Sequence, residues 1–142
     1  MSRMTRDQAQ AQLAGDVRAD LAAVGAMLEL LDRQFAAALH HKSAELAALT
    51  AELAPALDAM EARRVRRLSL VRALHGPAAA MADLIAALPP TAQTALAADW
   101  AELERRVRAC KEATARNTAL MTEQFSVMQR VLHGEEQIYA PR

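Results

Sequence analysis

Residues 96–131 decide the fold of this chain, and they read LAADWAELERRVRACKEATARNTALMTEQFSVMQRV. Positions on one face of this stretch recur in alternating steps of four and three residues: Leu96, Trp100, Leu103, Val107, Cys110, Thr114, Asn117, Met121, Gln124, Met128 and Val131. Such spacing, sustained over about five heptads, is the seam of a coiled-coil helix. It predicts one long helix over residues 92–133, with Thr91 as its N-cap and Gly134 as its C-terminal cap.

The composition of the whole chain also favours helices. Of its 142 residues, 53% are hydrophobic but only 3% are aromatic, because alanine and leucine supply most of the apolar side chains. Alanine and leucine favour helices, whereas the β-branched and aromatic residues that favour strands are scarce. A chain of this length has the size of one ordinary domain. We therefore expect an all-α protein with a single domain over residues 1–142.

Two helices are predicted in the first half of the chain. Apolar residues spaced by three and four indicate a first helix over residues 7–39, closed by the basic residues 40–42. A second helix is expected over residues 44–75, with Ser43 as its N-cap. Because an interior proline removes a backbone hydrogen bond, Pro55 should kink this helix or restart it.

Glycine and proline separate these helices from the long one. The stop at Gly76-Pro77 and the break at Pro89-Pro90 enclose a short third helix, predicted over residues 78–88. Two long helices joined by a short polar turn must lie antiparallel, so the first two form a hairpin. The last helix can lay its first half against that hairpin, which gives an elongated bundle followed by a short tail over residues 134–142.

The charge balance and the scarcity of special residues exclude several classes of function. The chain has 17 basic and 17 acidic residues, whereas a nucleic-acid binder usually carries a basic excess. The polar N-terminus contains no secretory signal, and no apolar run approaches the ~20 residues that span a membrane. A single cysteine fits a reducing compartment. We expect a soluble cytoplasmic protein that binds no nucleic acid and inserts into no membrane.

Enzymatic chemistry finds no support in the motifs. His40 and His41 are adjacent, and neighbours on a helix point about 100° apart, so they cannot share a metal ion. Cys110 lies on the apolar seam with no histidine near it in the sequence, as a buried inert thiol would. No phosphate-binding loop, metal motif or nucleophile elbow occurs. We expect no catalytic residue, no metal and no cofactor.

An arginine cluster in the second predicted helix leaves one alternative open. Its members are Arg63, Arg64, Arg66, Arg67 and Arg72. At ~100° per residue, Arg64 and Arg67 fall near the centre of the apolar stripe, whereas Arg63 and Arg66 point away from it. Either the core thins there, or the arginine stems cover apolar surface. A nucleic-acid binder is the weaker interpretation, because no aromatic residues for base stacking lie among the arginines.

The second half of the last helix differs from its first half. From Thr114 onward its seam mixes Asn117 and Gln124 with methionines. Polar seam residues weaken a permanent core yet fix register, and methionine adapts its shape to different partners. This pattern allows two interpretations: an ordinary bundle helix with an imperfect core, or a helix that docks a partner helix through i, i+3, i+4 and i+7 anchors.

Several short segments, taken in order, carry a family resemblance. MLELLDRQ (27–34) has a leucine pair followed by an acidic and glutamine-bearing turn, and EARR (61–64) precedes the stop LHGP (74–77). CKEATARNTALM (110–121) is the most specific segment, and an aliphatic-tyrosine pair follows at 138–139. Together these segments resemble the FlgN-like family of flagellar export chaperones.

The resemblance implies a function without chemistry. Such proteins are cytosolic chaperones that hold the C-terminal helical segments of the hook-filament junction proteins FlgK and FlgL before type III export. Carried over, the cargo-binding residues would be Asn117, Leu120, Met121, Gln124, Val127, Met128 and Val131. Thr114 replaces the first of two asparagines that relatives often carry. Tyr139 would contact the export gate protein FlhA.

Two further possibilities stay open on the sequence. The chain could be a generic helical coiled-coil module, with an interaction or regulatory role unrelated to flagella. The long seam of the last helix could also pair with itself, giving a homodimer whose interface mimics the cargo interface.

Overall fold

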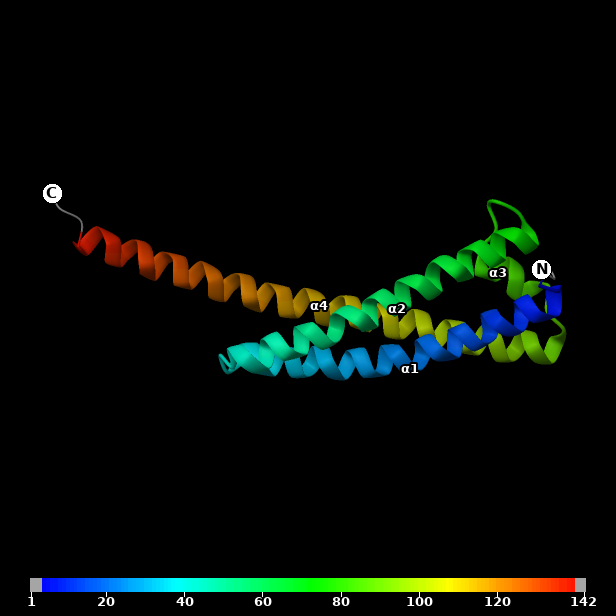
Figure 1. The fold of residues 1–142 in the computed structure, drawn as a ribbon, viewed down its shortest axis with the longest axis horizontal. Coiled ribbons are helices and arrows are strands. Elements are labelled where there is room, and N and C mark those ends of the chain that lie inside the picture. Colours follow the sequence, from blue (N-terminus) through cyan, green and yellow to red (C-terminus); the bar gives the residue numbers. More distant parts are fainter. Residues whose placement is uncertain (1–3, 140–142) are drawn as a thin grey trace.

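The computed structural model describes residues 4–139, and these form four helices in a long, narrow arrangement (Figure 1). α1 (Arg6–Leu39) and α2 (Ser43–His75) form an antiparallel hairpin, and α3 (Met81–Ala86) is a short helix near its open end. α4 (Pro90–Tyr139) runs back along the hairpin and continues past its turn. The predicted all-α class, the hairpin and the long last helix are confirmed.

The turn between α1 and α2 is a Schellman motif. The backbone N–H of Lys42 donates to the oxygen of Ala37 at 2.8 Å, and that of His41 donates to Ala38 at 3.2 Å. His41 adopts a left-handed conformation with φ of 56°, a position that glycine usually fills. The predicted cap at Ser43 is wrong, because Ser43 is already the first helical residue and Lys42 precedes it without a side-chain cap.

α2 is one continuous helix, so the predicted restart at Pro55 is wrong. Pro55 and Ala51 both lie on the exposed side of α2. The carbonyl group that loses its partner to the proline can therefore meet water. α2 moves away from α1 towards its C-terminal end (Figure 1).

The boundaries of the last two helices differ from the predictions. α3 is shorter than residues 78–88, and α4 begins at Pro90 because proline suits the first helical position, where its missing N–H has no helical partner. α4 also continues through Gly134 to Tyr139 rather than ending in a tail. A glycine inside a helix costs only ~1 kcal/mol, and the Glu-Glu-Gln that follows favours helix.

α1 is the central helix, and two apolar clusters lie along it. The larger cluster joins all four helices at the open end of the hairpin, through Leu13, Val17, Val24, Val71, Met81, Leu84, Leu96 and Leu103. The smaller cluster lies towards the turn and contains Met27, Leu31, Leu53 and Ala113. α2 and α4 both pack on α1, but no Cα of α2 lies within 8 Å of a Cα of α4. One long side of the three-helix arrangement is therefore open.

Candidate functional site

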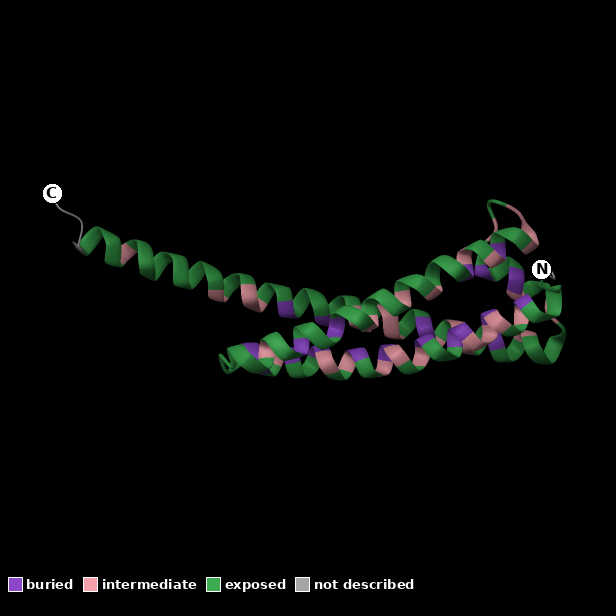
Figure 2. Ribbon diagram, in the orientation of Figure 1, coloured by how far each residue is buried: buried purple, intermediate pink, exposed green. Residues whose placement is uncertain are grey.

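The last part of α4 stands free of the hairpin. Gln124 Nε2 donates to the backbone oxygen of Ala38, near the end of α1, at 2.8 Å. Residues 125–139, here called the overhang, continue beyond the hairpin turn and are exposed along nearly their whole length (Figures 1 and 2). At ~1.5 Å per residue, the overhang is about 22 Å long.

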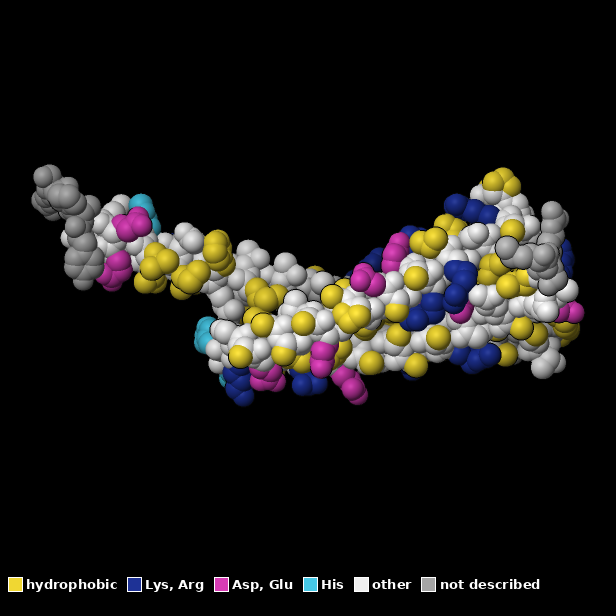
Figure 3. Space-filling view, viewed as in Figure 1, with side chains coloured by type: hydrophobic (Ala, Val, Ile, Leu, Met, Phe, Trp, Pro, Cys, Tyr) yellow, Lys and Arg dark blue, Asp and Glu magenta, His cyan; other side chains and the backbone are white. Residues whose placement is uncertain are grey.

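The overhang exposes large apolar side chains. They are Phe125, Val127, Met128, Val131, Leu132 and Ile138. Their exposed fractions run from 44% for Val127 to 72% for Ile138, and Figure 3 shows hydrophobic side chains gathered on this part of α4. Single exposed apolar residues are ordinary, but so many on one short helix mark a surface that binds a partner.

The exposed residues fall on two lines along the helix. At ~100° per residue, Val127 and Val131 continue the side of α4 that carries Asn117 and Gln124 and faces α1. Phe125 and Leu132 continue a second side, which carries Thr114 and faces the open space between α2 and α4. Met128 lies between these two lines. We call Val127, Met128 and Val131 the cargo strip, and Phe125, Met128 and Leu132 the groove line.

Asn117 is buried where α4 leaves the hairpin. Its side chain is only 1% exposed, and its Nδ2 donates to the backbone oxygen of Leu31 and to Gln34 Oε1, both at 2.8 Å. Gln34 Nε2 donates in turn to Thr50 Oγ1 at 3.1 Å, and the Thr50 hydroxyl donates to the oxygen of Leu46. One chain of hydrogen bonds therefore links α4, α1 and α2.

Arg116 reinforces this attachment of α4 to α1. Its Nη2 donates to Asp32 Oδ1 at 3.1 Å, and its Nε donates to Asn117 Oδ1 at the same distance. The guanidinium carbon lies 4.3 Å from the centre of the Phe35 ring, within the range of a cation–π contact. Arg116 and Asn117 thus fix the register of α4 on α1.

The seven predicted cargo-binding residues are divided by the structure. Asn117 is buried and Gln124 bonds to α1, so both hold α4 in place and neither offers a free surface in this conformation. Leu120 and Met121 are half-buried at the end of the hairpin, and the cargo strip is exposed. Tyr139 is the last residue of α4, and its side chain lies outside the described part of the chain.

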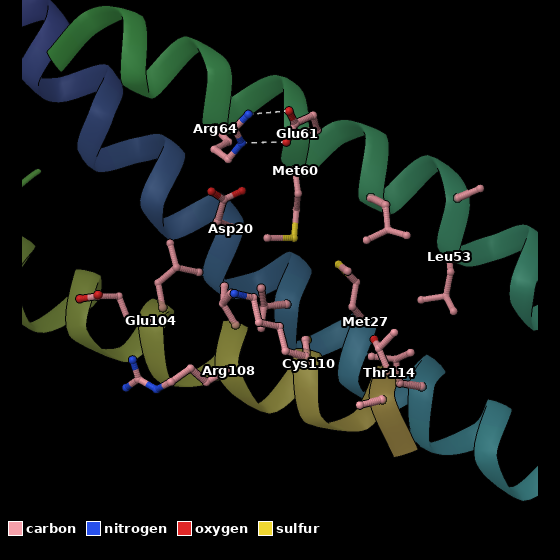
Figure 4. A pocket seen from close by; sticks show the side chains of 18 of the residues that line it. Asp20, Met27, Leu53, Met60, Glu61, Arg64, Glu104, Arg108, Cys110 and Thr114 are labelled. Atoms are coloured by element: carbon pink, nitrogen blue, oxygen red, sulfur yellow. Dashed lines mark hydrogen bonds and ion pairs between the residues drawn. The ribbon is translucent and has the colours of Figure 1, made fainter. Parts of the chain in front are cut away.

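An open groove lies between α2 and α4, with α1 as its floor. Its volume is about 1090 Å³, and its lining runs along α4 from Trp100 to Met121. Figure 4 shows Leu53 and Met60 of α2 and Met27 of α1 reaching into the space above Cys110 of α4. The groove is thus largely apolar and about 31 Å long at ~1.5 Å per residue.

Charged side chains line the walls of the groove. On α2, Arg64 and Glu61 form a double hydrogen bond, which raises the pKa of Arg64 and lowers the pKa of Glu61. On α4, Arg108 and Lys111 have no ion-pair partner among residues 4–139. Glu104 on the same wall has no ion-pair partner among these residues either, so the α4 wall presents unpaired charges of both signs with a positive excess.

Three members of the arginine cluster are paired with aspartates of α1. Arg67 Nη1 bonds to Asp20 Oδ2 at 2.7 Å, and Arg63 bonds to the other oxygen of the same carboxylate. Arg66 holds Asp16 through two hydrogen bonds of 2.7 and 3.0 Å. The expectation that Arg63 and Arg66 point away from the packed side is wrong, because both face α1. This pairing leaves less basic surface for phosphate groups than the sequence pattern indicates.

Arg67 also connects α2 to α4 across the floor of the groove. Its guanidinium carbon lies 5.2 Å from the centre of the Trp100 ring, while the same group bonds to Asp20 of α1. Asp20 is 0% exposed, so this ion pair is shielded from water. Arg67 therefore touches all three long helices at one end of the groove.

Side chains that could act as nucleophiles or metal ligands do not cluster in the described part of the chain. Burial raises the pKa of the half-buried Cys110 thiol, which favours its protonated form and slows its reaction as a nucleophile. Within residues 4–139, no three His, Cys, Asp or Glu side chains come together as a metal site would require. The described helices are also too polar or too short in their apolar stretches to cross a membrane.

Sequence reasoning missed the aspartates and the groove. Asp16 and Asp20 are four residues apart on the packed side of α1, where acidic residues are rare unless paired, so their position in the apolar pattern was the available signal. Gln34 and Thr50 lie on different helices, and periodicity along one helix gives no information about such a link. The groove depends on how three helices pack, which no single segment reveals.

The comparison with known proteins gives one result. The family model described as FlgN protein matches residues 4–134, more than nine tenths of the chain. No curated protein and no solved structure matches it. The matched range includes the hairpin, the groove and the first part of the overhang. The chain therefore belongs to the FlgN family, a family of flagellar export chaperones and not of enzymes.

Proposed function

We propose that this chain is a cytoplasmic chaperone that holds the C-terminal helical segments of the junction proteins FlgK and FlgL before type III flagellar export. The observation that carries the proposal is the exposed cargo strip of Val127, Met128 and Val131 on a helix that has left its own bundle. The strip continues the side of α4 that packs on α1 inside the bundle. Beyond the end of α1, a cargo helix would pack on the side of α4 that α1 covers within the bundle.

The arrangement suits temporary binding. Free coiled-coil segments of junction proteins would associate prematurely, and a chaperone that covers them lowers their free concentration by mass action. The overhang offers only a few apolar anchors along about four turns, so its complex can dissociate at the export gate. The polar anchors Asn117 and Gln124 meanwhile keep α4 attached to α1 when cargo leaves.

The test is a double substitution in the cargo strip, Val127→Asp with Val131→Asp. Burying one such side chain contributes roughly 1.5–2 kcal/mol, so losing two should weaken the binding of FlgK by roughly 100- to 700-fold. The measurement is the affinity of the purified full chain for FlgK and FlgL by titration calorimetry. Deleting the last helical segment of either cargo should have the same effect as the double substitution.

The matched control is Ser126→Asp with His133→Asp. These residues are exposed on the opposite side of the same helical turns, so the variant adds the same charges without touching the strip. It should bind cargo as the unchanged chain does, and circular dichroism should give equal helicity for both variants. Unchanged cargo affinity in the Val127 and Val131 variant would refute the proposal.

We propose further that Tyr139 contacts the export gate protein FlhA. The residue lies at the very end of α4, beyond the cargo strip, so cargo and gate can be engaged by different parts of one helix. Tyr139→Phe and Tyr139→Ala, compared in the same titrations, should lower the affinity for FlhA while leaving that for FlgK unchanged. Loss of both affinities together would contradict separate sites.

A further inference from the structure

The overhang has the length and the helical form that the groove can accept. α1, α2 and α4 make three sides of a bundle in which α2 runs antiparallel to the other two helices. The groove is the place that a fourth helix occupies in a four-helix bundle. The overhang is a helix that no other helix of its own chain covers. It is about 22 Å long, and the groove is about 31 Å long, so the overhang fits within the groove along its whole length.

The overhang of one chain cannot reach the groove of the same chain while α4 stays straight. It points away from the groove, beyond the hairpin turn (Figure 1). A second chain can run antiparallel to the first, with the two hairpin turns facing each other. Its overhang then reaches the end of the groove that lies nearest the hairpin turn. The two overhangs would then enter the two grooves by one two-fold operation, with Met121 close to the axis.

The charges favour this antiparallel direction. When the middle of the overhang lies beside the middle of the groove, Leu132 is level with Cys110 of the other chain, and Glu136 is level with Arg106. At ~100° per residue Glu136 lies on the same side of the overhang as Leu132, so it faces the groove within two residues of Arg108, which has no ion-pair partner among residues 4–139. A two-fold axis along the helices would place equal residues of the two α4 helices level with each other, so the parallel direction cannot bring both overhangs into both grooves.

We propose that the groove between α2 and α4 binds the overhang of a second copy of this chain, so that each copy completes the bundle of the other. The groove line of Phe125, Met128 and Leu132 packs against Leu53, Met60 and the Cys110 side of α4. The resulting homodimer hides the apolar overhang of each chain. Met128 belongs to both the groove line and the cargo strip, so cargo and a second copy compete for the overhang; this competition, unlike the dimer itself, rests on the proposed function.

The test uses the natural cysteine in the groove. In the full chain, Leu132→Cys should form two disulfides under mild oxidation with copper phenanthroline, each joining the introduced thiol of one copy to Cys110 of the other. Glu136→Cys, one turn further along, covers a register shifted by a turn. A covalent dimer on a non-reducing gel from either variant is the expected result, because the introduced cysteines of the two copies lie roughly 30 Å apart and cannot pair with each other.

The same variants on a Cys110→Ser background are the matched control and should give no covalent dimer. A disulfide that forms within one chain, seen as a faster monomer band, would show the overhang folded onto its own groove and would overturn the proposal. Absence of any disulfide together with a monomer in sedimentation velocity at every concentration would overturn it as well.

A surface variant separates this inference from the proposed function. Phe125→Asp with Leu132→Asp should convert the dimer to monomer in sedimentation velocity, whereas Val127→Asp with Val131→Asp should mainly lower cargo affinity. A dimer that persists in the Phe125 and Leu132 variant contradicts the inference alone. Cargo affinity that persists in the Val127 and Val131 variant contradicts the proposed function alone.

Discussion

Asn117 shows how one polar side chain can hold a long helix in register. Its amide group donates to a backbone oxygen and to Gln34 on α1. Gln34 in turn donates a hydrogen bond to Thr50 on α2. A buried amide that loses these partners costs about 1–3 kcal/mol, so sliding α4 along α1 by one turn is unfavourable. The asparagine therefore determines where α4 leaves the hairpin, and hence where the overhang begins.

The sequence pattern identified this residue but not its partner. Heptad spacing places Asn117 on the packed side of its helix, and the structure bears this out. Spacing gives the side of a helix without saying what covers it, so a contact to α1 and a contact to cargo give the same pattern. For Val127 and Val131 the same periodicity ends on an exposed surface, because the hairpin has already turned back.

The thiol of Cys110 allows a test at the scale of one residue. Burial raises its pKa above the ordinary value of 9.0, because desolvation disfavours the thiolate. We expect alkylation by iodoacetamide at about pH 8 to be several-fold slower in the folded chain than in the chain unfolded by urea. Equal rates in the two states would contradict a buried thiol.

The sign of the pH effect on stability follows from the same shift. The unfolded chain loses the thiol proton first as pH rises, so the folded state has its full stability below the ordinary thiol pKa. Stability then falls as pH rises towards the raised pKa of the folded state. Cys110→Ser should remove this part of the fall in urea unfolding measured on both sides of that window.

At the scale of elements, helix type and order were predictable and helix ends were less so. The apolar spacing and the Gly76-Pro77 stop placed α1 and α2 to within one residue. A helix restart at Pro55 and a helix end at Gly134 are both predicted by local preference, yet both residues lie inside helices. Local penalties of this kind are ~1–3 kcal/mol, and a helix with enough packing or good helix formers on both sides overcomes them.

The backbone of the turn between α1 and α2 is strained at one residue, and a substitution there should relieve the strain. His41 has φ of 56°, where a side chain costs ~1 kcal/mol more than glycine does. His41→Gly should therefore raise the free energy of unfolding by about 1 kcal/mol in urea denaturation. His40, with φ of −97°, is the matched control, and His40→Gly should give no gain. An equal gain from both variants would contradict strain at position 41.

At the scale of the whole molecule, two long helices, α2 and α4, pack on the central helix α1 and leave one side open. No segment taken alone predicts this, because the pattern of α2 and that of α4 are each satisfied by packing on α1. Ion pairs set the distance between α2 and α1 towards the open end of the hairpin, where Arg63, Arg66 and Arg67 of α2 bind aspartates of α1. The candidate binding surfaces are products of that packing.

The bridge through Asp20 should dominate the stability of the open end. Asp20→Asn leaves the guanidinium groups of Arg63 and Arg67 without a buried counter-charge, and should lower the free energy of unfolding by about 3 kcal/mol. Asp16→Asn is the matched control and should cost much less, since its partner Arg66 is half exposed and solvent screens the pair. Urea unfolding measures both, and similar losses would contradict the special role of Asp20.

The free end of α4 also bears on how long the protein survives in a cell. A solitary stretch of about four turns opens at little cost, since isolated helices of this length are marginal in water. Arg130 is exposed there, so we expect trypsin to cut after it while the hairpin is still intact. A helix bound to the overhang, whether from cargo or from a second copy, should shield that bond, so we expect the bound protein to be cut more slowly than a chain whose overhang is free.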